Sequence, residues 1–384
     1  MPTPSIASTV EAAITGYNHG TMWPYQRKSF FIFDKFLQLY GDDFWHYAKS
    51  SQNGTTWSTA YNTNIVYSSG LGRNGSYWYD GTYLHCVGSQ GGFLGSQLWY
   101  RRFLVNFDGS LTPSAASQLV LSTAGESMLW PSIAVDSDGY PFISYIRQDA
   151  ATNRYPYVTK SSTNDGTWVT DAGYPFQLSV VADNNWRAGI IPLNNLRMYV
   201  LYARNANACV GRLYNAGAWG AAEAASVTVM GAHSHCFSIT NDGDNVVLTF
   251  LSGFNLIYRY RTFGVGWGAE EVIHVSAETR SAPVVGLVNS VPYAFWIEAG
   301  SIWYMKREGG VWDATPNLIV SDNMAEDVFG DLNDMITCSP SGTEMFALSY
   351  INGGLAGPWN VRHVYLSFSE PALGTPRAIP HAGI

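Results

Sequence analysis

The sequence predicts an all-β fold, a single seven-bladed β-propeller of four-stranded antiparallel blades. Three observations support it. A tight polar turn beside an aromatic residue recurs along the chain, and four strand-like segments accompany each copy. The copies are spaced by roughly 45 to 60 residues, which indicates a repeat array. Sheets of this size cannot bury both faces alone, so they are expected to pack radially as blades around an axis. Six blades is the fallback.

The stretch 130–183 shows one blade most clearly. Ile133 to Asp136 is a short apolar run, and the Asp-Gly pair that follows it is a hairpin signal. Phe142 to Ile146 alternates in the manner of a strand, Tyr155 to Lys160 gives a third strand, and Gln177 to Val181 a fourth. The rest of the chain repeats this small antiparallel sheet.

The other blades are placed by matching this pattern. The aromatic landmarks at the turns are Trp57, Phe107, Trp168, Trp219, Trp267 and Trp312. The predicted innermost strands are Ser29–Phe33, Ser76–Tyr79, Ser132–Asp136, Ala188–Leu193, Cys236–Thr240, Ala282–Leu287 and Met335–Ser339. The approximate blades are 25–70, 71–125, 126–183, 184–231, 232–277, 278–323 and 324–370.

The last copy lacks a clear fourth strand after Phe368. The N-terminal stretch 5–15 is expected to supply that strand and so close the ring. Residues 371–384 are predicted to be a C-terminal tail outside the propeller.

Two of the turns resemble the Asp-box of sialidase-like (BNR-repeat) propellers, whose form is Ser-x-Asp-x-Gly-x-Thr-Trp. Ser162–Trp168 is one residue short after its glycine, and Ser51–Trp57 is short before it. Through the repeat pattern the resemblance covers nearly the whole chain, and it implies the propeller fold. Such turns lie on the rim, where an Asx side chain bonds the turn backbone, glycine takes a positive φ and tryptophan packs between strands.

Composition excludes several functional classes. The net charge is −8, charged residues make up 13% of the chain and aromatic residues 15%, so a general binder of nucleic acid or anionic membranes is not expected. No run approaches the ~18 apolar residues of a membrane span. The N-terminus has no basic start and no apolar segment, so no secretory signal is expected.

No cofactor and no metal is expected either. The cysteines are far apart and form no C-x-x-C pair, which makes a zinc site improbable and buried free thiols the better interpretation. They are Cys86, Cys209, Cys236 and Cys338.

Loops that lead into the innermost strands converge on the axis of a propeller, so ligand-binding residues are expected just before those strands. The candidates are Arg27, Arg73, Trp130, Arg187, His235 and Arg280. The sialidase family holds its substrate acid with three arginines, and the resemblance therefore implies an acidic-sugar pocket formed by Arg27, Arg187 and Arg280. Trp23 and Trp130 are the expected stacking walls. The alternative is that these arginines bind backbone carbonyls or carboxylates between blades.

The sequence singles out no catalytic residue. The Phe-Arg-Ile-Pro motif of sialidases is replaced by R-K-S-F-F, and no spacing marks a tyrosine and glutamate pair. The carboxylates before inner strands are expected in capping or turn roles; they are Glu126, Glu278, Asp327 and Asp331. A lyase would need a base such as His85, which is interpreted as a core histidine, or the His233 and His235 pair, which lacks a carboxylate partner for a metal.

Third strands alternate aromatic and basic residues, as in Tyr258–Arg261. The aromatic side chains are expected to pack between blades while the basic stems cover sheet edges. Inserts at Gly88–Gln97 and Asp149–Arg154 join second to third strands, so they are expected to deepen the arginine-bearing face.

The favoured function is non-catalytic glycan recognition or adhesion, outside the cell or on a virion surface, as a receptor-binding or structural part of a phage particle or extracellular assembly. Its partners would be a glycan or acidic polysaccharide and other subunits of that assembly. Two alternatives stay open. One is a divergent glycoside hydrolase or polysaccharide lyase acting on acidic sugars, and the other is a purely structural assembly hub.

Overall fold

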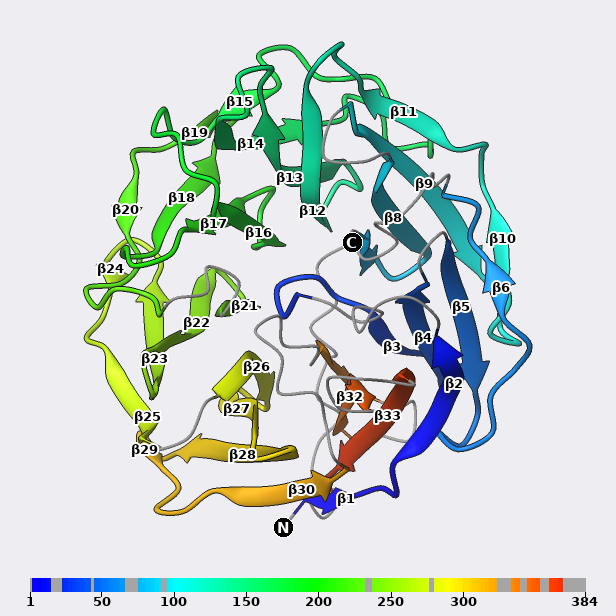
Figure 1. Ribbon diagram of the computed structural model, residues 1–384, viewed down its shortest axis with the longest axis vertical. Coiled ribbons are helices and arrows are strands. Elements are labelled where there is room, and N and C mark those ends of the chain that lie inside the picture. Colours follow the sequence, from blue (N-terminus) through cyan, green and yellow to red (C-terminus); the bar gives the residue numbers. More distant parts are fainter. Residues whose placement is uncertain are drawn as a thin grey trace.

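The computed structural model describes residues 2–14, 23–42, 45–65, 75–90, 95–231, 237–275, 280–322, 333–338, 344–352 and 359–368. Every regular element in these ranges is a β-strand, and seven antiparallel sheets surround one axis (Figure 1). The predicted seven-bladed propeller is confirmed. No helix in the described ranges is long and apolar enough to cross a membrane.

The strands of the first three blades follow the chain from the axis outward. Blade 1 holds β3 (Ser29–Ile32), β4 (Lys35–Gly41), β5 (His46–Ser51) and β6 (Tyr61–Asn62). Blade 2 holds β7 (Gly75–Tyr79), β8 (Tyr83–Gln90), β9 (Gln97–Val105), β10 (Leu111–Pro113) and β11 (Gln118–Leu121). Blade 3 holds β12 (Ser127–Val135), β13 (Pro141–Gln148), β14 (Arg154–Lys160) and β15 (Phe176–Gln177).

The next three blades repeat this order. Blade 4 holds β16 (Arg187–Pro192), β17 (Met198–Ala203), β18 (Val210–Asn215), β19 (Ala218–Trp219) and β20 (Glu223–Ala224). Blade 5 holds β21 (Phe237–Asp242), β22 (Asn245–Ser252), β23 (Asn255–Thr262), β24 (Gly266–Trp267) and β25 (Glu271–Val275). Blade 6 holds β26 (Arg280–Val288), β27 (Val291–Glu298), β28 (Ser301–Glu308), β29 (Val311–Trp312) and β30 (Asn317–Ser321). Where five strands are present, the outermost position is split into two short strands that both pair with the third strand.

Blade 7 joins the two ends of the chain. It holds β31 (Asn333–Cys338), β32 (Glu344–Asn352) and β33 (Trp359–Ser367), with β1 (Thr3–Pro4) and β2 (Ser8–Ile14) on its outer side. Strand β2 pairs antiparallel with β33, so the predicted closure of the ring by an N-terminal strand is confirmed.

The turns that resemble the Asp-box have the expected backbone geometry. Asn53 Oδ1 accepts hydrogen bonds from the amides of Thr55 and Thr56, both at 2.9 Å, beside Gly54 with a φ of +72°. In blade 3, Asp165 plays the part of Asn53. A side-chain acceptor and a glycine in the left-handed region together fix such a turn.

Tryptophans at these turns hold neighbouring blades together. In four blades the indole N–H donates to a side chain of the preceding blade at 3.0 to 3.2 Å. The pairs are Trp57 with Ser8, Trp219 with Tyr174, Trp267 with Tyr199, and Trp312 with Glu271. The sequence landmark is therefore a joint between blades.

Basic residues on third strands add ion pairs at the same joints. Arg261 of β23 donates two hydrogen bonds to Glu223 of β20, both at 2.7 Å. Arg307 of β28 forms the same two-pronged pair with Glu271 of β25, both bonds at 2.8 Å. The aromatic residues were expected to pack between blades, as Tyr258 does on Trp312, whereas these basic residues form ion pairs between blades, a role that was not predicted.

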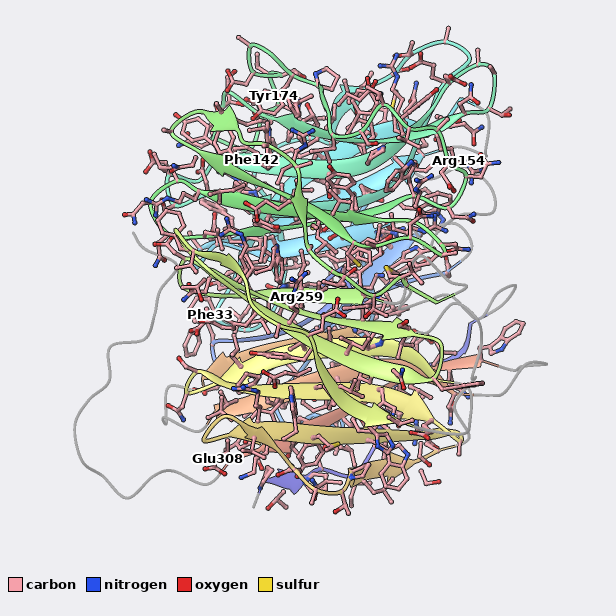
Figure 2. The ribbon with its side chains drawn as sticks, turned by 90° about the vertical axis from the view of Figure 1, so that its left-hand side faces the viewer. Phe33, Phe142, Arg154, Tyr174, Arg259 and Glu308 are labelled. Atoms are coloured by element: carbon pink, nitrogen blue, oxygen red, sulfur yellow. The ribbon has the colours of Figure 1, made fainter. Side chains whose placement is uncertain are left out.

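The two faces of the disc carry different loops. We call the face at which the innermost strands begin the start face. It carries the loops between blades and those that join second to third strands, such as 149–153. The opposite face, called the turn face, carries the turns between first and second strands and between third and fourth strands. Figure 2 shows Arg154 on one side of the disc and Phe33 and Glu308 on the other.

Candidate functional site

The segment Trp23–Lys28, which leads into β3, lies against the inner ends of blades on the other side of the axis. The side-chain Nε2 of Gln26 donates to the carbonyl of Pro131 in β12 at 2.7 Å. The ring of Tyr25 stacks on Phe237 of β21, with the centroids 4.9 Å apart. Gln26 and Tyr25 are both buried, and Figure 1 shows this dark blue segment reaching the middle of the ring. The segment therefore lies at the axis, where the sequence predicted an acidic-sugar pocket.

Trp130 faces this segment because β12 is irregular at that point. The pairing of β12 with β13 shifts register between Leu129 and Ser132, and Trp130 has a φ of +50°. A bulge re-aims a side chain, and a large residue in the left-handed region costs of order 1–3 kcal/mol. Such strain persists where the surrounding structure enforces it, and it is concentrated at functional sites.

Arg187, the first residue of β16, is held between two indole rings. Its guanidinium carbon lies 3.6 Å from the ring centre of Trp130 and 4.6 Å from that of Trp23. Its Nη1 donates to the carbonyl of Trp186 at 2.7 Å, and the residue is only 8% exposed. Cation–π attraction is strongest for tryptophan and increases when the cation is desolvated.

A second arginine reaches the same indole. Arg154, the first residue of β14, has its guanidinium carbon 5.0 Å from the ring centre of Trp130. It donates to Oε1 of Gln148 at 2.7 Å and to the carbonyl of Asn184 at 2.8 Å. Burial lowers the pKa of Arg154, although an arginine stays charged. Trp23, Trp130, Arg154 and Arg187 are called the axial cluster below.

Two ion pairs flank the axial cluster on the start face. Arg147 donates to both oxygens of Glu126, at 2.6 and 2.7 Å, and this bond raises the pKa of Arg147. Arg204 lies 3.2 Å from the carboxylate of Asp183. Glu126, a candidate acid in the sequence, therefore serves as the partner of a neighbouring arginine.

Arg27 occupies a different level of the axis. Its guanidinium carbon lies 4.8 Å from the ring centre of Trp78, and Nη2 donates to Oγ1 of Thr240 at 3.3 Å. It lines a hollow, also bordered by Ile190, with room for about one water molecule. Because Ile190 is three residues beyond Arg187 on β16, the two sites are about 10 Å apart along the strand.

Among the sequence candidates, the structure thus brings Trp130 and Arg187 together and places Arg27 elsewhere. Arg280 begins β26, but its side chain is outside the described part of the structure. The remaining candidates, with the other acids and histidines considered, lie outside the described residues; they are Arg73, His235, His233, Glu278, Asp327 and Asp331.

Sequence reasoning assigned no role to two further residues of this region. Arg154 ended an insert that was expected to deepen the face, and only that position hinted at it. The hydroxyl of Tyr25 is buried and has no hydrogen-bond partner. Burial raises the pKa of Tyr25, and the charge of Arg187 opposes this increase.

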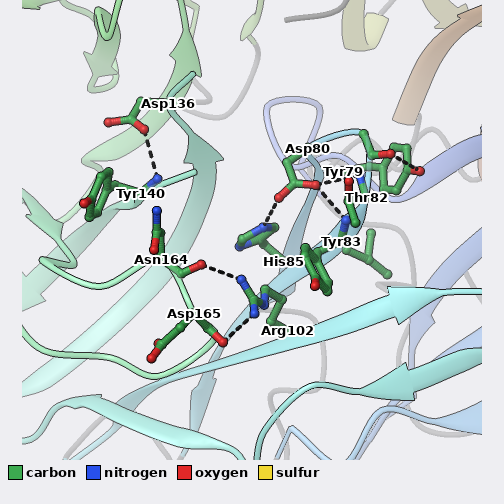
Figure 3. Close-up of polar contacts among 12 residues, drawn as sticks. Tyr79, Asp80, Thr82, Tyr83, His85, Arg102, Asp136, Tyr140, Asn164 and Asp165 are labelled. Carbon is green, nitrogen blue, oxygen red and sulfur yellow. Dashed lines mark hydrogen bonds and ion pairs between the residues drawn. The ribbon is translucent and has the colours of Figure 1, made fainter. Parts of the chain in front are cut away.

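His85 belongs to the joint between blades 2 and 3 (Figure 3). Its ring is fully buried, with Nδ1 2.9 Å from the hydroxyl of Tyr100 and Nε2 2.8 Å from Asp80. Burial lowers the pKa of His85, although Asp80 opposes the change. Nearby Arg102 donates to carbonyls in the turn 164–165. These contacts agree with the predicted core histidine. Among the described residues, no three His, Cys, Asp or Glu side chains could hold a metal.

Comparisons with known proteins bear on the fold. No family model and no curated protein matches the sequence. An ulvan lyase from a new polysaccharide lyase family has a TM-score of 0.58 at 11% identity, over 92% of this chain and 94% of that chain. An α-L-arabinanase of Penicillium chrysogenum, complexed with arabinobiose, has a TM-score of 0.52 at 11% identity, over 95% of this chain and 98% of that chain. These similarities establish a shared propeller fold.

Proposed function

We propose that the protein is a non-catalytic glycan-recognition propeller that binds acidic sugars on its start face. The observation that carries the proposal is the axial cluster, in which Arg154 and Arg187 lie on one indole of Trp130. Guanidinium groups pair bidentately with carboxylates, and an aromatic ring beside them offers an apolar surface to a sugar ring.

Three further facts support this proposal. Few charged residues and many aromatic residues suit a surface that meets neutral hydroxyl groups. Trp130 keeps a strained backbone, which an ordinary packing role does not require. Among propellers of similar fold, one is an ulvan lyase and another was solved with arabinobiose. Under this proposal the protein acts outside the cell or on a virion surface, as part of an extracellular assembly or phage particle whose other subunits are its partners.

The test is a glycan array that includes uronate and sialate oligosaccharides, read beside a product assay on the same acidic polysaccharides. We expect binding without turnover. Arg154→Ala should weaken the binding of acidic sugars by about 10- to 100-fold, because hydrogen bonds to a charged group contribute about 1.5–3 kcal/mol. Arg187→Lys keeps the charge and loses the fork, so it should weaken binding less.

Arg197→Ala provides a matched control, since Arg197 lies on the turn face and pairs with Asp244 at 3.0 Å. It should bind as the unmodified protein does. Unchanged binding by Arg154→Ala, or no acidic sugar bound at all, would contradict the proposal.

The second candidate function is a divergent glycoside hydrolase or polysaccharide lyase, and Tyr25 is the observation that favours it. Its buried hydroxyl has no hydrogen-bond partner, and its pKa responds to Arg187. Turnover in the product assay that is lost in Tyr25→Phe would replace the binding proposal with this one.

A further inference from the structure

Two exposed phenylalanines lie side by side on the turn face, far from the axial cluster. Phe107 is 76% exposed and Phe33 is 39% exposed, and their ring centroids are 5.8 Å apart with a tilt of 40°. Phe33 belongs to the turn between β3 and β4 of blade 1, and Phe107 to the turn between β9 and β10 of blade 2. Figure 2 shows Phe33 at the edge of its face.

The backbone at Phe33 adopts a conformation that bulky residues rarely take. Ile32 pairs with Lys35, so Phe33 and Asp34 form a two-residue hairpin turn with φ values of +51° and +58°. Such turns favour Gly, Asn and Asp, and a bulky residue is rarely found in this region. The equivalent turn of blade 6 uses Asn289 and Ser290.

The turn that carries Phe107 is fixed onto blade 1. Asp108 Oδ1 accepts hydrogen bonds from the amide and hydroxyl of Ser110, at 2.9 and 2.6 Å. Gly109 has a φ of +84°, and a Cβ there would lie 2.9 Å from Cδ of Lys35. Local hydrogen bonds and close packing therefore constrain the turn from which the ring of Phe107 projects.

Phe107 differs from the aromatic residues of other turns, which pack against the preceding blade. Trp168, in the corresponding turn of blade 3, is 8% exposed and packs on Tyr100 of the preceding blade with centroids 5.4 Å apart. Phe107 instead directs its ring to solvent, although burial of an aromatic ring would stabilise the fold.

We propose that Phe33 and Phe107 form a second carbohydrate site, a platform that takes one neutral sugar unit of a polysaccharide chain. The apolar face of a sugar ring matches two adjacent phenyl rings in size. Its hydroxyls can both donate and accept hydrogen bonds, and mixed charges surround the rings: Asp34 and Asp108 are carboxylates, and the ammonium of Lys35 lies 5.3 Å from the centre of Phe107.

Area and charge favour a sugar over other occupants. A stable protein partner needs about 800 Å² on each side, with few Asp and Lys residues at its centre, and two phenyl rings cannot supply that surface. A nucleic acid would bring phosphates beside Asp34 and Asp108, which repel them.

The experiment is affinity electrophoresis of the full chain in gels that contain linear arabinan, β-galactan, xylan or glucomannan. We expect at least one gel to retard the protein, and Phe107→Ala to weaken that interaction by about tenfold, an amount typical of one lost aromatic contact. Phe33→Ala should act similarly, and Phe107→Trp should restore retardation. Because Phe107 is 76% exposed, its removal leaves the core intact.

Val265→Ala is the matched control, since Val265 is 85% exposed in the corresponding turn of blade 5. This variant should be retarded as the unmodified protein is. The gels contain neutral polysaccharides, whereas the axial cluster is tested with acidic sugars, so failure here is distinct from failure at the axial cluster. The proposal is overturned if no gel retards the protein, or if Phe107→Ala behaves like Val265→Ala. It is also overturned if sedimentation shows a dimer that Phe107→Ala dissolves.

Discussion

Arginines lie on aromatic rings both at the blade joints and beside the axis, but their hydrogen-bond partners differ. At a joint, Arg261 lies 5.2 Å from the ring centre of Tyr199 and forms two hydrogen bonds to Glu223. Beside the axis, Arg154 lies 5.0 Å from the ring centre of Trp130, and its acceptors include a side-chain amide and a backbone carbonyl.

The different hydrogen-bond partners indicate that the same arginine–aromatic contact has two roles. A carboxylate that accepts two hydrogen bonds also neutralises the guanidinium charge, so the joint gains stability from a matched pair. Beside the axis, the guanidinium of Arg154 is oriented by hydrogen bonds to a side-chain amide and a backbone carbonyl. We therefore expect variants at the joints to change the free energy of unfolding, and variants beside the axis to change binding.

The largest expected effect follows from Glu223→Ala, which leaves Arg261 without its carboxylate in a site where only 5% of the residue is exposed. The free energy of unfolding should fall by about 2–4 kcal/mol, measured by urea denaturation, with glycan binding unchanged. Glu308→Ala is the control, since its side chain is 68% exposed and pairs with Lys306 at the surface. Loss of binding in folded Glu223→Ala protein would end the distinction between the two regions.

Acid sensitivity extends the comparison to the joint between blades 7 and 1. There His363 is packed against Phe36 and Trp57, and burial lowers its pKa from 6.5 to about 3. Since the unfolded chain then binds the proton more tightly, this contribution to stability is complete above pH 6.5 and decreases as the pH falls toward 3. Between pH 7 and pH 5 the loss is about 2 kcal/mol.

The measurement is urea denaturation at pH 7 and pH 5, for the unmodified protein and for His363→Phe. The variant should lose less stability on acidification. Equal losses in the two proteins would mean that other groups carry the acid sensitivity of this joint.

A smaller effect is expected at the indole of Trp312. Trp312→Phe removes the hydrogen bond to Glu271 and keeps most of the ring, so it should cost about 1 kcal/mol. A double-mutant cycle with Glu271→Gln, read from urea denaturation, measures how strongly the two residues are coupled. Additive effects would show that the indole only fills space.

The smallest effect on stability is expected for Arg154→Ala, although its effect on binding should be large. Arg154 donates to Gln148 and to the carbonyl of Asn184 near the surface, and the free energy of unfolding should change by about 0.5 kcal/mol. Thermal denaturation is sufficient to check this. A loss comparable with that of Glu223→Ala would make Arg154 a structural residue like the arginines of the joints.

The blades could be predicted because their signals are local. Turn glycines, Asx residues and tryptophans recur within each sheet, so blade number follows from counting them. The N-terminal strand could be predicted because the last sheet lacked a partner for β33. Arg187 followed from its position at the start of an inner strand.

The axial cluster could not be predicted in full, because long-range packing builds it. Gln26 bonds Pro131 across 105 residues of sequence, and nothing near Trp23 signals that its segment fills the axis. Arg154 contacts Trp130 only because a bulge turns that indole, and no residue pattern marks the bulge. Contacts of this kind depend on how the blades meet.

The pairing of β2 with β33 closes the ring of blades. Strand β33 would otherwise be an edge with unpaired amides and carbonyls, the feature by which sheets recruit strands from other molecules. Residues 8–14 cover that edge and connect to blade 1 through residues outside the described ranges. A molecule in which β2 detached from β33 could pair with the N-terminal strand of a second molecule. An exchange of these strands would link two complete rings without changing the interior of either.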